Sequence, residues 1–191
     1  MSPRTSDKYQ EIRELARQKI MDTALELFAN EGYYPTSISD IAKSAGISKG
    51  LMYNYFESKE VLLKEIIFTG INNLAEEFDP NRDGILTHEE LIHFIRQSFK
   101  LVKEHTTYWK LYFMVMYQPP VLSLFEKELQ DFLGYYLKMI DQYFAKQKVK
   151  NPLAESRLFS SVMDGIFMNY VMSPETFPID EIEERVVKMY Q

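Results

Sequence analysis

The sequence predicts an all-α protein made of two helical domains. Along most of its 191 residues, apolar side chains recur at intervals of three and four, which is the spacing of an amphipathic helix. The 7 glycines and 8 prolines cluster between these periodic segments, where helices begin and end. No run of alternating apolar and polar residues is bounded by hairpin turns, so we expect essentially no β-sheet.

The composition excludes several classes of protein. The formal net charge is -6, opposite in sign to that of an evenly basic nucleic-acid coat protein. The chain has no cysteine, so disulfides, thiolate catalysis and cysteine-based metal sites are impossible. Its apolar runs are far shorter than the roughly 20 residues that span a bilayer, and its N-terminus carries no secretory signal. We therefore expect a cytoplasmic protein.

Residues 1–65 have the pattern of a small N-terminal domain. Their first helix carries one apolar stripe and ends at Gly32, a residue suited to the left-handed turn that often follows a helix. A short second helix is expected over 38–45. Ser37 would cap its N-terminus, and Asp40 lies in its first turn, where the helix dipole favours negative charge.

A third helix is expected after a short turn. Gly46 permits a left-handed backbone conformation, and Ser48 would cap a helix over 49–55. Ser58 would cap the helix after that. Two short helices joined by a glycine-containing turn describe a helix-turn-helix, whose second helix enters the major groove of DNA.

Polar residues of this segment lie where DNA phosphates could bind. The serine caps leave helix N–H groups near a surface, and the N-terminus of a helix attracts anions. Two lysines add positive charge, and two tyrosines can present hydroxyls to phosphates. Helix capping alone would also explain the serines, and core packing alone would explain Tyr53. The residues in question are Ser37, Ser48, Ser58, Lys49, Lys59, Tyr53 and Tyr55.

Residues 36–62, TSISDIAKSAGISKGLMYNYFESKEVL, resemble the DNA-binding signature of the TetR (tetracycline-repressor) family. The resemblance is close over residues 10–65 and extends to the rest only in length and helical character. It implies a homodimeric transcription regulator, usually a repressor released by a small ligand. Two recognition helices would then bind successive major grooves of a near-palindromic DNA operator.

The resemblance also assigns DNA contacts by position. Leu51 stands where the family often has a small or polar residue, and we interpret it as a contact to a thymine methyl group. The resemblance assigns phosphate contacts to Thr36, Ser37, Tyr53, Tyr55 and Lys59, and base-edge contacts to Lys49, Gly50, Leu51 and Asn54.

One motif in this segment also matches a catalytic pattern. Residues 46–50 read G-x-S-x-G, the nucleophile elbow of hydrolases, but that motif needs a preceding strand, and here a helix precedes it. The three histidines lack the spacing of a zinc-binding helix, and no set of carboxylates and histidines has an interpretable spacing. We predict that the protein is not an enzyme and requires no cofactor.

Residues 79–90, DPNRDGILTHEE, match the calcium-binding EF-hand loop at every constrained position. Turn chemistry and a capping box that begins at Thr87 explain part of the same pattern, and EF-hands normally occur in pairs. If the loop binds Ca²⁺, we expect it to stiffen the joint between the DNA-binding and C-terminal domains. The alternative function is a calcium-binding regulatory protein whose helix-turn-helix serves only interaction. The expected Ca²⁺ ligands are Asp79, Asn81, Asp83, Ile85 and Glu90.

Residues 66–191 would form a helical domain for ligand binding and dimerisation. Residues 108–117 are apolar nearly all round, as in a helix that is buried on most sides. Their aromatic and methionine side chains would form either ordinary core or a pocket for an apolar or aromatic small-molecule effector. The candidate pocket residues are Trp109, Tyr112, Phe113, Met116 and Tyr117.

Two later helices, expected over 119–148 and 153–173, carry more apolar surface than one core needs. On the second, Ser161, Gly165 and Asn169 recur every four residues, a spacing that lets another helix approach closely. We predict that both helices pair with their copies across a two-fold axis, with packing inside one chain as the alternative. A final short helix is expected over 179–190.

The negative charge lies outside the N-terminal domain. Residues 1–64 contain 9 basic and 9 acidic residues, whereas residues 65–191 contain 13 and 19. A neutral DNA-facing domain excludes indiscriminate binding to DNA of any sequence, but it allows binding to specific DNA sites. It predicts weak nonspecific affinity for DNA at physiological salt.

Overall fold

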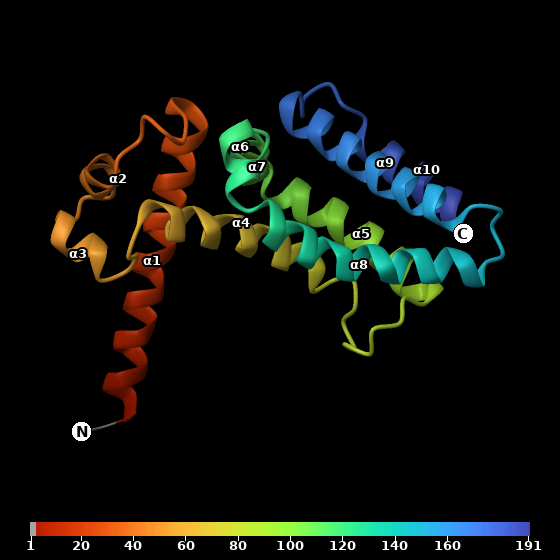
Figure 1. Ribbon diagram of the computed structural model, residues 1–191, viewed down its shortest axis with the longest axis horizontal. Coiled ribbons are helices and arrows are strands. Elements are labelled where there is room, and N and C mark those ends of the chain that lie inside the picture. The colour runs from red at the N-terminus through yellow and green to blue at the C-terminus, as the bar shows by residue number, and fades with distance from the viewer. Residues whose placement is uncertain (1–2) are drawn as a thin grey trace. The chain divides into compact units, whose positions relative to one another are not determined.

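The computed structural model describes the backbone of residues 3–191 and the side chains from residue 8 onward (Figure 1). The regular structure of these residues is helical and contains no strand, which confirms the all-α prediction. None of the helices in this part of the chain is both long enough and apolar enough to cross a membrane. The helices are α1 (Pro3–Glu31), α2 (Ile38–Ala45), α3 (Lys49–Tyr53), α4 (Lys59–Ala75), α5 (His88–Glu104), α6 (Thr106–Met116), α7 (Pro119–Leu124), α8 (Glu126–Lys146), α9 (Pro152–Met172) and α10 (Ile179–Tyr190).

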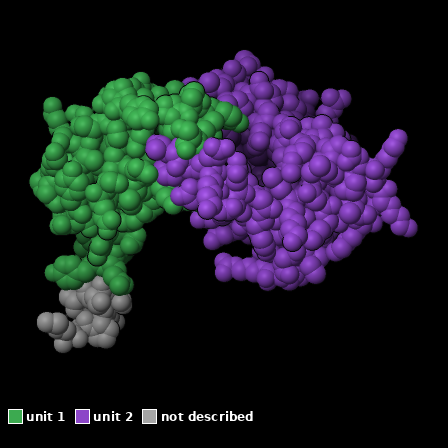
Figure 2. Space-filling model, in the orientation of Figure 1, with its two compact units in different colours: residues 1–69, 114–123 green, residues 70–113, 124–191 purple. Residues whose placement is uncertain are grey.

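The chain divides into two compact units (Figure 2). The first unit contains the described residues up to Thr69 together with residues 114–123, and the second contains residues 70–113 and 124–191. The sequence pattern predicted a single boundary after residue 65. It did not predict that residues 114–123 join the N-terminal unit. Helices α4 and α6 each contribute residues to both units.

The core of the first unit is built from the apolar sides of α1, α2 and α4. Leu25 and Phe28 of α1, Ile41 of α2 and Leu62 of α4 are each at most 2% exposed. Burial of one such side chain contributes about 1.5–3 kcal/mol. Helices as short as α2 and α3 are marginal in isolation, so this packing stabilises them.

Hydrogen bonds to serine side chains fix the starts of α2 and α3, and a left-handed glycine follows the end of α2. The Ser37 hydroxyl accepts a hydrogen bond from the Asp40 N–H at 3.2 Å, and the Asp40 carboxylate accepts one from the Ser37 N–H at 3.0 Å. Gly46 follows α2 with a φ of 74°. The Ser48 hydroxyl then accepts from the Leu51 N–H at 3.1 Å. This geometry confirms the predicted helix-turn-helix.

The interior of the second unit is rich in aromatic side chains. Phe78 lies edge-on against Phe94, with ring centroids 4.9 Å apart, and Phe99 lies edge-on against Phe167 at 5.1 Å. Such pairs contribute about 0.5–1.5 kcal/mol beyond their buried area. Helices α8 and α9 pack side by side, and α10 packs on α5 (Figure 1).

The prediction of one helix over 119–148 is wrong, because α7 and α8 are separated at Phe125. The Phe125 backbone has φ -125° and ψ 19°, outside the helical range, and its side chain is 1% exposed. Burial of this phenylalanine favours the irregular backbone. The apolar spacing continues through the break, so the sequence pattern alone could not reveal it.

Candidate functional site

Helix α3 is held by one buried side chain and exposes the rest of its surface. Met52 is 0% exposed and packs into the core of the first unit, whereas Leu51 and Tyr53 are 41% and 47% exposed. The helix ends at Tyr53, two residues before the predicted end. The exposed side of this short segment contains six of the predicted DNA-contacting residues, Ser48, Lys49, Gly50, Leu51, Tyr53 and Asn54.

Gly50 has no structural requirement inside the chain. Its backbone does not have positive φ, and a Cβ atom added to it would meet nothing within 4 Å. Glycine inside a helix costs about 0.5–1 kcal/mol relative to alanine. A close approach of another molecule to the α3 backbone would explain why glycine is used here.

Ser37 is exposed at the N-terminus of α2, but its hydroxyl hydrogen is already engaged. The hydroxyl donates to the Asp40 carboxylate at 2.5 Å. The hydrogen bonds from Ser37 hold the pKa of Asp40 below its ordinary value. A phosphate contact from Ser37 therefore requires its hydroxyl to turn away from Asp40.

Thr36 is buried and Lys59 is half-buried, and both side chains bond to backbone carbonyls. Thr36 is 0% exposed, and its hydroxyl donates to the Gly32 carbonyl at 2.8 Å. The Lys59 ammonium donates to the carbonyls of Tyr33 at 2.8 Å, Tyr34 at 3.2 Å and Thr36 at 2.8 Å. It also lies 4.4 Å from the centroid of the Tyr33 ring.

Burial of Thr36 contradicts a phosphate contact from its side chain, whereas a phosphate contact from Lys59 stays a prediction. The connection between α1 and α2 leaves backbone carbonyls that need donors, and Lys59 and Thr36 supply them. Partial burial lowers the pKa of Lys59. Both residues therefore hold the helix-turn-helix in place.

Arg17 is a structural residue that the sequence analysis missed. Its Nε donates to Glu65 at 2.6 Å, its Nη2 pairs with the second oxygen of the same carboxylate, and its Nη1 donates to the Tyr55 carbonyl at 3.0 Å. Its guanidinium carbon lies 4.4 Å from the centroid of the Phe56 ring. Arg17 thus joins α1 to α4 and to the residues that follow α3. An arginine next to the apolar stripe of the first helix was the only signal in the sequence.

The side chains of the loop over 79–90 bond mainly within the loop. Asp79 is 7% exposed and accepts from the Asp83 N–H at 3.2 Å and the Gly84 N–H at 3.0 Å. The Asn81 amide donates to Glu90 at 2.9 Å, and Glu90 also closes the capping box of α5. Among the described residues, no group of three or more His, Cys, Asp or Glu side chains is arranged to hold a metal ion. Calcium binding by this loop, with the Ile85 carbonyl as a further ligand, stays a prediction.

The candidate ligand-pocket residues have different environments and belong to different units. Trp109 and Tyr112, in the second unit, are 1% and 5% exposed, and Phe113 is half-buried. Met116 and Tyr117 belong to the first unit, where Met116 is half-buried and Tyr117 is 53% exposed. The Trp109 Nε1–H has no hydrogen-bond acceptor among the described residues, although it is buried.

Tyr112 packs directly on the backbone of α4. A Cβ atom at Gly70 would lie 2.5 Å from the Tyr112 ring, so only glycine leaves room for this ring. Burial raises the pKa of Tyr112 far above its ordinary value, so its hydroxyl stays neutral. The centroid of the Trp109 ring lies 5.3 Å from that of Tyr112 and 5.4 Å from that of Tyr108.

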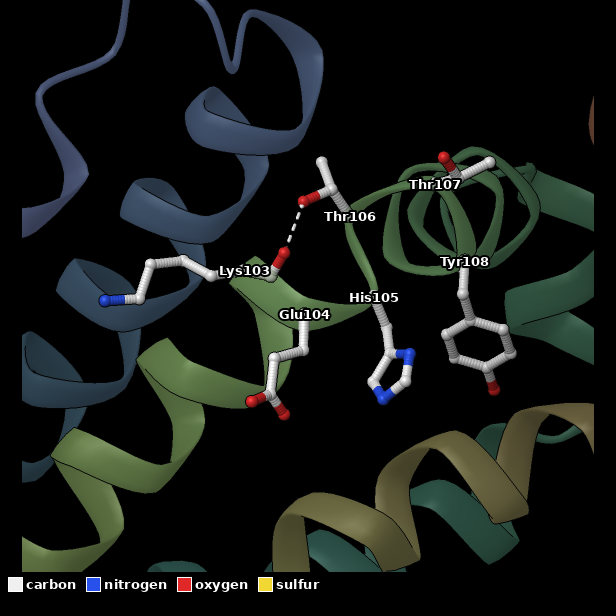
Figure 3. Close-up of a pocket in the computed structure, with 6 residues that line it drawn as sticks. All are labelled: Lys103, Glu104, His105, Thr106, Thr107 and Tyr108. Atoms are coloured by element: carbon white, nitrogen blue, oxygen red, sulfur yellow. Dashed lines mark hydrogen bonds between the residues drawn. The ribbon is translucent and has the colours of Figure 1, made fainter.

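A cavity of about 370 Å³ lies at the turn from α5 to α6 (Figure 3). The Thr106 hydroxyl donates to the Lys103 carbonyl at 3.1 Å beside it. Tyr108 is the aromatic residue of its lining and also contacts the ring of Trp109. None of the five predicted pocket residues is among those that line it, which are Lys103, Glu104, His105, Thr106, Thr107 and Tyr108.

The three residues predicted to contact a second copy lie on an exposed side of α9. Ser161, Gly165 and Asn169 are all exposed, and the Asn169 amide donates to the Gly165 carbonyl at 2.6 Å. A Cβ atom at Gly165 would meet nothing within 4 Å. Leu158 and Met172 of the same helix are 49% and 52% exposed.

Comparison with known proteins identifies proteins that are similar in the helix-turn-helix and in the fold. Residues 20–66 match the sequence model of a family described as bacterial regulatory proteins, tetR family. The helix-turn-helix of this chain is therefore similar to that of the TetR family. Members of this family are not enzymes, in agreement with the sequence prediction. Ser48 of the G-x-S-x-G motif follows a helix, α2, and caps α3, so this motif is not a nucleophile elbow.

Two relatives illustrate the range of the similarity. YuxN, an uncharacterized HTH-type transcriptional regulator of Bacillus subtilis (strain 168), is 40% identical in a match that covers 38% of this chain and 31% of the relative. This chain thus spans about a third of the length of that relative. The fatty acid metabolism regulator protein of the same organism is 23% identical and is matched over 90% of this chain and 91% of its own.

A solved structure extends the likeness along the chain. The transcriptional regulator FadR from Bacillus subtilis, in complex with stearoyl-CoA, has a TM-score of 0.70 to this chain at 22% identity. The match covers 91% of this chain and 96% of FadR. At this level of identity the likeness establishes a shared fold in both units.

Proposed function

We propose that this protein is a DNA-binding transcription regulator of the cytoplasm and that α3 is its recognition helix. The observation that carries the proposal is the exposed side of α3, which combines one cation, one glycine and the apolar Leu51. Lys49 can bind a phosphate or a guanine edge, Gly50 leaves the backbone accessible, and Leu51 fits a thymine methyl group. The match of residues 20–66 to the TetR family model supports this role.

Fluorescence anisotropy with DNA from upstream of the protein's own gene tests the proposal. Lys49→Ala and Tyr53→Phe should each weaken binding at least fivefold, because each removes a polar contact to DNA. Lys188→Ala, which removes an exposed cation from α10, is the matched control and should bind as the wild type does. Unchanged binding in both α3 variants would contradict the assignment of α3.

The exposed side of α9 supports a homodimer as the functional state. Gly165 costs helix stability without any contact inside the chain that requires glycine, and exposed Leu158 and Met172 flank it. A second copy of α9 would use this space and cover the two apolar side chains. A two-fold dimer would set two α3 helices about 34 Å apart, which suits a near-palindromic operator.

Sedimentation velocity of a matched pair of variants tests the dimer. Gly165→Leu should shift the protein toward monomer, since its side chain fills the space for the second helix. Glu181→Leu adds the same side chain to the exposed surface of α10 and should leave the dimer intact. A dimeric Gly165→Leu protein would place the interface elsewhere.

The proposed effector is a small apolar molecule that carries one hydrogen-bond acceptor. Trp109 and Tyr112 offer an aromatic surface. The buried Trp109 N–H lacks a hydrogen-bond acceptor, and an unsatisfied buried donor destabilises the protein by about 1–3 kcal/mol until a ligand supplies the acceptor. The complex of FadR with stearoyl-CoA makes a long-chain acyl compound the first probe to test. Binding would release the operator if the effector prefers the state that does not fit DNA, and the protein would then act as a repressor.

Trp109 is the only tryptophan in the sequence, so intrinsic fluorescence reports on this position directly. Stearoyl-CoA should change the emission and release labelled operator DNA, whereas coenzyme A without the acyl chain should do neither. Trp109→Phe keeps the aromatic surface but removes the N–H, so it should weaken release by stearoyl-CoA at least fivefold. Equal responses to both compounds would refute an acyl effector.

A further inference from the structure

We infer that Gln118 is a positioning residue that joins the segment between α6 and α7 to the C-terminal end of α1, and thereby holds the start of the helix-turn-helix in place. Its side-chain oxygen accepts a hydrogen bond from the Tyr33 N–H at 3.0 Å. Its side-chain nitrogen donates to the Phe28 carbonyl at 2.9 Å. These bonds connect residues that are 85 and 90 positions apart in the sequence.

The two bonds satisfy backbone groups at the end of α1. Tyr33 follows the last turn of α1 and is 6% exposed, so its N–H needs a partner within the protein. Phe28 lies in that last turn, and its carbonyl also accepts from the Gly32 N–H at 3.1 Å. Loss of the Gln118 side chain would leave the buried Tyr33 N–H without an acceptor.

The contact continues from Tyr33 into the helix-turn-helix. The Tyr33 carbonyl accepts from the Lys59 ammonium at 2.8 Å, and the same ammonium donates to the Thr36 carbonyl at 2.8 Å. Thr36 directly precedes Ser37, the N-cap of α2. Gln118 is therefore connected to the start of α2 through the backbone of Tyr33 and the side chain of Lys59.

Gln118 is itself fixed to the end of α6. Its backbone N–H donates to the Val115 carbonyl in the last turn of α6 at 3.1 Å, and its carbonyl accepts from the Val121 N–H at 2.9 Å. Pro119 and Pro120 follow, and their rings restrict the backbone of the turn. A shift of α6 therefore carries Gln118 with it.

The consequence for regulation rests on the proposed function. Helix α6 also contains Trp109 and Tyr112, the residues proposed to meet the effector. An effector that displaces α6 would move Gln118, and the two bonds to α1 would lengthen or break. The start of α2 would then lose the support that it receives from Gln118 through Tyr33 and Lys59, and a state without this support would bind the operator less tightly.

Amide hydrogen exchange followed by NMR tests the link without DNA or effector. Gln118→Met keeps the length of the side chain but removes both bonds, so the Tyr33 amide should exchange at least tenfold faster. Gln130→Met is the matched control, since Gln130 is an exposed glutamine of α8 that bonds to Glu126 in its own helix. Gln118→Glu keeps an acceptor and should preserve much of the protection. Unchanged exchange at Tyr33 in Gln118→Met would overturn the inference.

DNA binding separates positioning from a purely structural role. In Gln118→Met, affinity for the upstream DNA should fall at least fivefold relative to affinity for random-sequence DNA, because orientation matters to a specific site and much less to phosphate attraction. An equal loss on both DNAs would overturn the positioning role. If the wild type binds no DNA, the proposed function fails, and the exchange of Tyr33 still decides the role of Gln118.

Discussion

Replacement of Gly50 by alanine should stabilise the free protein and weaken its binding to DNA. Gly50 has helical backbone, and an added Cβ meets nothing within 4 Å. Alanine is favoured over glycine in helices by about 0.5–1 kcal/mol, which for a chain of this size is a rise of about 1–4 °C in melting temperature. A methyl group inserted into a close contact with DNA would cost about 1–3 kcal/mol, as overpacking does, which predicts a loss of about tenfold in operator affinity.

Gly46→Ala is the matched control, because it lies four residues away and its added Cβ also meets nothing within 4 Å. Its φ of 74° is left-handed, so alanine there should destabilise the fold by about 1–2 kcal/mol. Differential scanning calorimetry and fluorescence anisotropy on the two variants separate stability from DNA contact. A Gly50→Ala protein that binds its operator as tightly as the wild type does would refute the inference that DNA approaches this backbone.

Three further predictions address the fold and the loop over 79–90. Phe125→Ala should lower the free energy of unfolding by about 3–5 kcal/mol in urea titrations, because its 1% exposed side chain leaves a cavity at the break between α7 and α8; a loss below 1 kcal/mol would contradict this account of the break. The stability that Asp40 contributes is present above the unfolded pKa, near 4, and is lost as pH falls through its lowered folded pKa, so thermal melts from about pH 5 to pH 2 should show a steeper loss in the wild type than in Asp40→Asn. Parallel curves would contradict the role of the Ser37–Asp40 pair. If the loop binds calcium, titration calorimetry should give heat and the melting temperature should rise, with both effects lost in Asp79→Asn; no heat and no shift in the wild type would sink the hypothesis.

The parts of the fold that the sequence predicted well depend on residues close together in the chain. Ser37 with Asp40 and Thr87 with Glu90 form capping boxes, in which each side chain bonds to backbone three positions away. The left-handed turn at Gly46 is equally local. Such features appear in sequence as short patterns, because the interacting groups are fixed by helix geometry alone.

The polar contacts that orient the helix-turn-helix could not be predicted in the same way. Arg17 bonds to a carboxylate 48 residues away, and Gln118 reaches backbone groups 85 and 90 residues away. Arginine and glutamine at these positions are compatible with any exposed helix surface. Only the packing decides which buried backbone group lies within reach of each side chain.

The positions of the cations also change what the neutral charge of the N-terminal domain implies. Residues 1–64 contain 9 basic residues, but the structure uses Arg17 and Lys59 to bind carbonyls and a carboxylate inside the first unit. We therefore predict that these two charges release no counterions from DNA phosphates, and that the domain makes fewer phosphate contacts than its sequence suggests. Lys49→Ala should lower the slope of log affinity against log salt by about 1, whereas Lys59→Met should lower the melting temperature and leave that slope unchanged. A reduced slope in Lys59→Met would return Lys59 to the phosphate contacts that the family resemblance assigned to it.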